Sequence, residues 1–213
     1  MITKTVRINK KWYTYDHIRD LADQFREKYD PNACPVDIES IIEFKLDMEI
    51  RAVPGLRSEH DIEAWLSKDM QTIIVDADTY MQDLFHARLR FTLAHEIGHC
   101  ELHSDFYREA IFKTSEDFIK YRGEMDEGEL LWIARHANEF AGRLLVPVEP
   151  LYEMVEGLKP RIEILRKKVG NSGLDELDAD VRLRDAVATT LSQKFNVLPS
   201  VISNRLRVEK IKL

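Results

Sequence analysis

The sequence predicts an α+β fold, with several amphipathic helices and one small antiparallel sheet. Apolar residues recur at helical spacing in several segments, and three short β-type runs follow one another between residues 48 and 75. The chain has 213 residues, of which 44% are hydrophobic and 32% are charged. These values are typical of one globular domain or one and a half, and they exclude disordered and fibrous proteins.

The first elements expected are two helices. Residues 17–29 carry apolar side chains at helical spacing, and Asp30-Pro31 ends this helix. A second helix begins after Asp37, which is a suitable N-cap, and continues to Phe44.

The expected strands are residues 48–53, 62–66 and 72–75. Pro54-Gly55 and a polar turn at 67–69 separate them, so we expect an antiparallel sheet beside the following helix. An edge strand of such a sheet can hold an extended peptide by adding it as a further strand. The sequence does not show which strand lies at the edge.

The most informative pattern is His95-Glu96-Ile97-Gly98-His99. The preceding run, 85–94, has no Pro or Gly and places apolar residues at helical spacing, so the pattern lies within a helix. His95 and His99 are then one turn apart, about 6 Å along the axis, and can hold one Zn²⁺. Glu96 is placed to act on a metal-bound water, which indicates metal-assisted hydrolysis, most simply of a peptide bond.

Chance does not explain this pattern well, since roughly 0.02 matches are expected in a chain of this composition. Gly98 costs its helix up to about 1 kcal/mol relative to Ala. Such a glycine between the two histidines suggests that another part of the chain packs closely against it.

Residues 104–129 are acidic and lack a clear period, so we expect an irregular connector, with a lid or substrate loop as the alternative. Residues 130–145 form a strong amphipathic helix. Trp65, Phe91 and Phe140 are assigned to the hydrophobic core.

Pro147 and Pro150 end the helix of residues 130–145, and residues 155–169 form a further helix that is interrupted near Pro160. The best linker is Gly170–Gly173. It divides the chain into a main domain, residues 1–169, and a C-terminal segment, residues 174–213.

In the C-terminal segment, residues 184–195 form a helix, residues 196–199 a turn, and Ser200 caps a second helix that ends at Val208. This arrangement is similar to a helix-turn-helix. Residues 181–213 carry a net charge of +5, whereas the rest of the chain carries −12. Weak DNA contact or partner recognition is one interpretation, and a helical hairpin packed on the main domain is the other.

Other classes are disfavoured. No apolar stretch approaches the roughly 18–20 residues of a membrane span, so we expect no membrane partner. Residues 1–11 lack the apolar core of a secretory signal. Cys34 and Cys100 do not form a CxxC pair, and two free thiols indicate a cytoplasmic protein.

Taken together, residues 90–99, Leu102-His103 and residues 137–147 resemble the ImmA/IrrE family of zinc metallopeptidases. The resemblance covers roughly residues 15–150. It implies a zincin-like core, in which a small antiparallel sheet packs on the helices that bear the motif. It also implies a cytoplasmic protease that cleaves helix-turn-helix repressors and so switches on stress-response or mobile-element genes.

The resemblance further implies the metal site of thermolysin-like gluzincins. His95 and His99 would bind Zn²⁺, and Glu96 would be the general base. A Glu from a second helix would be the third ligand, four residues before an Asn or Asp. Asn138 matches the latter position and would orient a histidine ligand, but Ala134 stands where the Glu is expected. Mn²⁺ or Fe²⁺ would suit the same histidines.

A methyl group cannot bind zinc, and three explanations of Ala134 stay open. These are an engineered substitution, a natural member that binds without cleaving, and replacement of the ligand by a carboxylate of the preceding loop, such as Glu129. His103 lies about 12 Å along the axis from His95, too far unless the helix breaks. His136 and Glu139 point away from the site.

The sequence thus leaves two hypotheses about function. The first is a zinc-dependent regulatory endopeptidase that cleaves a partner such as a repressor. The second is a non-catalytic regulator that binds a protein or DNA through the same fold.

Overall fold

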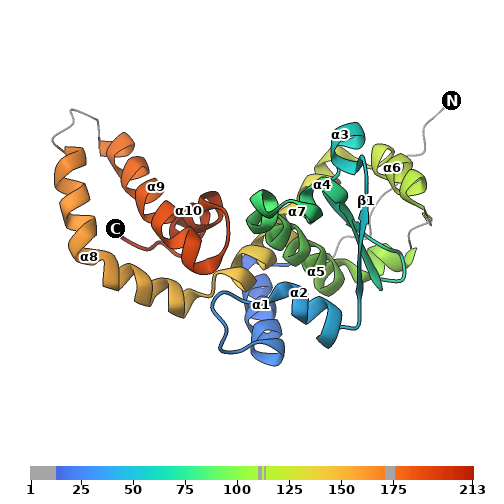
Figure 1. The fold of residues 1–213 in the computed structure, drawn as a ribbon, viewed down its shortest axis with the longest axis horizontal. Helices are drawn as coiled ribbons and strands as arrows, with labels where there is room; N and C mark the ends of the chain where they lie inside the picture. The colour runs from blue at the N-terminus through green and yellow to red at the C-terminus, as the bar shows by residue number, and fades with distance from the viewer. Residues whose placement is uncertain (1–12, 110–111, 113, 171–175) are drawn as a thin grey trace.

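The structure is a computed structural model that describes residues 13–109, 112, 114–170 and 176–213 (Figure 1). Its helices are α1 (Tyr15–Tyr29), α2 (Ile38–Ser40), the π-helix η1 (Ile41–Lys45), α3 (Leu56–His60), α4 (Ala77–Met81), the 3₁₀ turn η2 (Asp83–Phe85), α5 (His86–Glu109), α6 (Ser115–Gly123), α7 (Glu127–Leu145), α8 (Val148–Gly170), α9 (Glu176–Phe195) and α10 (Pro199–Val208). Its strands are β1 (Glu49–Val53), β2 (Ala64–Leu66) and β3 (Thr72–Asp76). The α+β prediction is confirmed.

Helix α5 lies between the other layers of the molecule. It packs against α7 on one side and against β2, α2 and α4 on others. Leu93, Ala94 and Ile97 are completely buried. Figure 1 shows the sheet with α3, α4 and α6 at one end of the molecule, and the hairpin of α8 and α9 at the other. The motif helix is therefore held from several directions.

The close packing predicted at Gly98 is present. A Cβ atom at this position would lie 3.1 Å from Cα and 3.2 Å from the carbonyl oxygen of Ala137 in α7. Contacts this short are tighter than most Cβ contacts in proteins, so a side chain here would push the backbone of α7 away by a few tenths of an ångström, and Gly98 favours the close approach of α5 and α7. This approach brings the side chains of α7 to the motif.

The sheet is mixed, so the prediction of an antiparallel sheet is wrong in part. Its order is β1-β3-β2, with β1 parallel and β2 antiparallel to β3. After β1 the chain turns at Gly55, whose φ is +82°, and forms α3 and β2 before it returns as β3. This crossover gives β1 and β3 the same direction. It leaves β2 as the edge strand next to α5.

Residues 104–129 are more regular than predicted. Residues 104–109 continue α5, and α6 begins at a capping box in which Thr114 and Asp117 each accept a hydrogen bond from the other's backbone N–H. A Thr followed three residues later by an acidic residue was the sequence signal for this helix. Residues 110, 111 and 113 lie outside the described residues.

Helix α8 begins soon after α7 and is not interrupted near Pro160, contrary to the prediction. Pro150 lies in its first turn, where a missing N–H costs little. Pro160 removes one internal hydrogen bond but does not end the helix. In Figure 1, α8 is a curved helix, as expected for a helix with an internal proline.

The helix pair predicted near the C-terminus is present as α9 and α10, although α9 begins earlier than expected. Ser200 is not the cap of α10, because Leu198 is the N-cap and Pro199 occupies the first turn. Proline suits this position, since its fixed φ is already helical. Of the predicted linker, residues 171–173 lie outside the described residues, and the boundary between the two predicted domains stays a prediction.

Arg90 joins the turn between α9 and α10 to the motif helix. It is buried, and it donates hydrogen bonds to the carbonyl oxygens of Val36, at 2.6 Å, and Asn196, at 3.0 Å. These two charge-assisted hydrogen bonds to backbone carbonyls fix the two segments against α5.

A network of buried ion pairs joins α10 to α7 and α1. Arg205, which is completely buried, pairs with Glu139 of α7 at 2.7 Å and with Glu209. Glu139 also accepts from Arg19 of α1 at 2.7 Å, and Glu209 from Arg143 of α7 at 3.0 Å. Because burial of an unpaired charge is costly, these groups hold the C-terminal helices on the motif domain.

Among the helices of the described residues, none is long and apolar enough to cross a membrane. Cys34 and Cys100 are both free, as predicted.

We expect Arg205→Met to lower the free energy of unfolding by about 3 kcal/mol, because it removes one partner from a buried ion-pair network. The control is Arg207→Met, which changes an exposed arginine on the same helix and should alter stability by only about 0.5 kcal/mol. Denaturant unfolding followed by circular dichroism measures both. Equal losses in the two variants would contradict this role of the network.

Candidate metal centre

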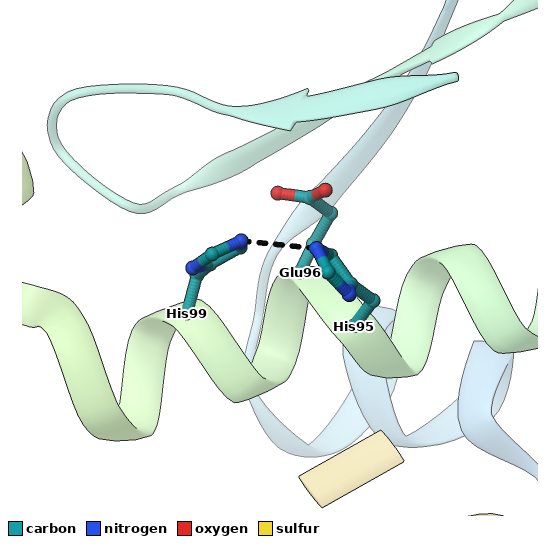
Figure 2. A group of neighbouring side chains, drawn as sticks. All are labelled: His95, Glu96 and His99. Atoms are coloured by element: carbon teal, nitrogen blue, oxygen red, sulfur yellow. Dashed lines mark hydrogen bonds between the residues drawn. The ribbon is translucent and has the colours of Figure 1, made fainter. Parts of the chain in front are cut away.

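The two imidazoles of the motif meet above one face of α5 (Figure 2). The Nε2 atoms of His95 and His99 are 3.0 Å apart. Two bonds of about 2.0–2.1 Å from a tetrahedral zinc would place such atoms about 3.3 Å apart. The observed spacing is slightly shorter than this value, so a small outward rotation of the rings would let the pair bind a single zinc-sized ion.

The other ring nitrogen of His95 is held by Asn138 of α7, with 2.9 Å between Nδ1 and Oδ1. Because an amide oxygen can only accept, Nδ1 carries the proton and Nε2 keeps its lone pair for a metal. The structure thus brings Asn138 to the position that the resemblance implied.

The other ring nitrogen of His99 is held by His103, with 3.0 Å between the two Nδ1 atoms. The expectation of an unbroken helix is wrong here, because His103 leaves helical geometry, with φ −124° and ψ 21°. The break does not make His103 a ligand beside His95. His103 lies at the far side of the His99 ring, where its Nδ1 atom can accept a hydrogen bond from the Nδ1–H of His99.

His136 and Glu139 point away from the metal site, as predicted. The ring of His136 stacks on that of His103, with centroids 5.8 Å apart and planes 11° apart. Glu139 belongs to the ion-pair network of Arg205.

Removal from bulk water keeps the imidazoles neutral. It lowers the pKa of His95 to about 4, against the opposing effect of its bond to Asn138. It also lowers the pKa of His99 well below the ordinary value, and that of His103 to about 3. Neutral rings are the form of histidine that binds metals.

Glu96 points from α5 toward the sheet, beside the two imidazoles (Figure 2). It is 4% exposed, and its Oε2 atom has no hydrogen-bond partner among the described residues. Burial raises the pKa of Glu96 to about 8. A carboxyl group that gains and loses a proton near neutral pH is suited to general acid–base catalysis.

These side chains open into a cavity of about 560 Å³. One wall is β2 with the preceding Glu63, and another is the face of α7 that bears Ala134 and Asn138. Trp65 and Phe91, which were assigned to the core, also line it, whereas Phe140 is completely buried. The sequence pattern could not distinguish an aromatic residue that lines the cavity from one in the core, because side chains of both kinds are mostly buried.

Strand β2 presents unpaired backbone groups on its outer side. Asp76 donates to the carbonyl oxygen of Glu63, at 2.8 Å, and Ser67 donates to that of Thr72, at 2.9 Å. Since bonding alternates along an antiparallel pair, the N–H and C=O of Ala64 face away from β3. Ala64 lines the cavity, so these groups are available to an extended peptide.

Ala134 faces the same cavity as the two histidines, and its methyl group offers no ligand. Glu129 does not replace it, because it lies in the first turn of α7 and not in a loop, and it does not line the cavity. Glu127 does line the cavity, but two helical turns, about 10 Å, before Ala134.

Within the described part of the chain, the metal-binding side chains that lie close enough to share one ion are those of His95, Glu96 and His99. The two imidazoles fit Zn²⁺, and the position of the usual third protein ligand is open.

A comparison with known families agrees with this geometry. The family model of the IrrE N-terminal-like domain of the M78 peptidases matches residues 81–207. The chain belongs to the M78 peptidase family. A search of the curated proteins found no match. The family range contains α5, α7 and most of α10, so it includes C-terminal helices that the resemblance seen in the sequence had left out.

We expect Ala134→Glu to raise the zinc affinity of this M78 peptidase at least about tenfold, because it supplies a third ligand from the facing helix. The matched control is Ala134→Gln, which has nearly the same size but no charge. Competition with a chromogenic chelator measures the affinity, and elemental analysis gives the zinc content. If Ala134→Glu binds zinc no more tightly than the original chain, the assignment of position 134 is wrong.

We expect His103→Leu to weaken zinc binding by about 10–100-fold, because the Nδ1 proton of His99 then loses its acceptor. His103→Asn places an amide oxygen near the lost nitrogen and should restore most of the affinity. A purely structural role would predict a loss in both variants. Zinc competition, together with thermal unfolding of the metal-free variants, separates these cases.

Proposed function

We propose that this chain is a zinc-dependent endopeptidase of regulatory type that cleaves a protein partner in the cytoplasm. The observation that carries the proposal is the group of the half-buried His95 and the buried His99 and Glu96 beside the edge of β2. It combines a metal-binding pair, a carboxyl group and a strand that can hold a peptide.

A bound zinc ion would supply a polarised water and a positive charge beside the scissile carbonyl. His95 and His99 would hold it through Nε2, while Asn138 and His103 fix the two rings through Nδ1. Glu96 would take a proton from the attacking water and deliver it to the amine nitrogen of the leaving group. Its burial keeps this carboxyl group apart from competing solvent.

The substrate would lie along β2. The outward N–H and C=O of Ala64 would bond to the peptide backbone, whatever the side chains of the substrate are. Such bonds would lay an extended chain across the cavity above Glu96. They favour a polypeptide over a compact small molecule as the substrate class.

A helix-turn-helix repressor is the partner that the family resemblance supports. Cleavage of a repressor would couple this enzyme to stress-response or mobile-element genes.

Ala134 supports a second candidate, a non-catalytic regulator. With two histidines and no third protein ligand, the chain would bind its partner along β2 without cleaving it. Contact with DNA through the exposed basic residues of the C-terminal segment, such as Arg207, Lys210 and Lys212, belongs to this alternative.

The test is cleavage of a peptide library by the zinc-loaded chain and by its Ala134→Glu form, followed by mass spectrometry. We expect Glu96→Gln in the Ala134→Glu form to slow cleavage by about 10²–10⁴-fold, because it removes the general base. Zinc content should stay the same. Cleavage that survives this change would exclude the role of Glu96, and a library left intact by both zinc-loaded forms would favour the non-catalytic regulator.

A further inference from the structure

A second cavity, of about 350 Å³, lies beside the metal centre. Helix α10 and its N-cap form one wall, and α5 and α7 form the others. The residues from the C-terminal segment are Leu198, Ser200, Val201 and Asn204. The opposite side includes Arg88 of α5 and Gly142 of α7.

The two cavities adjoin each other. Glu63, Phe91, Thr92 and Asn138 line both of them. Asn138 is also the residue that holds His95. Side by side, the two cavities extend from Trp65, past the two histidines, to the N-terminal end of α10, and we call them together the groove.

The wall made by α10 is fixed in place. Arg205 is completely buried among carboxylates of α7 and of the segment after α10, and Arg90 holds the turn at Asn196. Leu198 nevertheless remains 39% exposed, and Ser200 and Asn204 are exposed as well. A rigid element that presents an apolar side chain and two polar ones to a groove is suited to recognition.

We propose that α10 forms a substrate subsite, in which residues on one side of the scissile bond of an extended polypeptide bind between Leu198, Asn204 and Phe91. This inference rests on the proposed function and names the part of the enzyme that selects its substrate. Leu198 and Phe91 would take an apolar side chain. Ser200 and Asn204 would hydrogen-bond to the backbone of the substrate where it extends beyond β2.

The lining of the groove favours a polypeptide over DNA. A DNA surface needs several cations for the phosphates. Here Arg88 is paired with the carboxylate of Glu63, which itself lines the groove. Arg205, a basic residue of the predicted DNA-binding helix, is buried in ion pairs.

The experiment places the photo-crosslinker p-benzoylphenylalanine at position 198 or 204 of the full-length, zinc-loaded chain that carries Ala134→Glu and Glu96→Gln. The control position is Lys194, which is exposed on α9 and lines neither cavity. The probe is a library of biotinylated twelve-residue peptides. We expect crosslinking from positions 198 and 204, but not from 194, and competition by unlabelled peptides.

Cleavage kinetics in the Ala134→Glu form give a second measurement. Leu198→Ala and Asn204→Ala should each raise KM about fivefold and leave kcat unchanged, since they remove binding away from the reacting atoms. Lys194→Ala should change neither constant.

The outcomes separate this inference from the proposed function. Cleavage of the library without crosslinking above the control and without a change in KM overturns the subsite and leaves the peptidase standing. Crosslinking without cleavage overturns the peptidase and leaves α10 as a peptide-binding surface of the non-catalytic regulator. Failure of both overturns both, and crosslinking to labelled duplex DNA in place of peptide overturns the subsite in favour of a DNA contact.

Discussion

The close contact between α5 and α7 is the constraint on which the site depends. Gly98 lets the backbone of Ala137 approach so closely that an added Cβ atom would lie 3.1 Å from the Ala137 Cα. The neighbouring residue, Asn138, then reaches His95, and Ala134 enters the same cavity one turn earlier. Gly98 lowers the intrinsic stability of the motif helix, but it permits the close approach of α5 and α7 that builds the metal site from two helices.

The polar atoms around this contact are arranged for a ligand. Each histidine has one ring nitrogen engaged, by Asn138 or by His103, and the two remaining nitrogens face each other. Glu96 stays buried with an oxygen atom that lacks a partner. Buried polar groups normally have hydrogen-bond partners. A buried carboxyl oxygen without one, beside a metal-binding pair, therefore indicates a site that a bound ion or substrate completes.

The C-terminal helices belong to the same arrangement. Arg205 and Arg90 fix α10 and its preceding turn against the helices of the site, and the family model extends over them. A helix pair that looks like a DNA-binding unit is thereby held with part of its exposed face beside the metal centre. Its similarity to a helix-turn-helix describes its shape and does not by itself assign it a partner.

The sequence by itself determined the local features. The motif, the helix that bears it, the N-cap at Asp37, the close packing at Gly98 and the α+β class all follow from patterns between residues near in the chain. Only the tertiary structure decided the direction of β1 relative to β3, the break in helical geometry at His103 and the position of α10 as a wall of the groove. These depend on contacts between distant segments, such as Arg205 with Glu139, and no local period encodes such contacts.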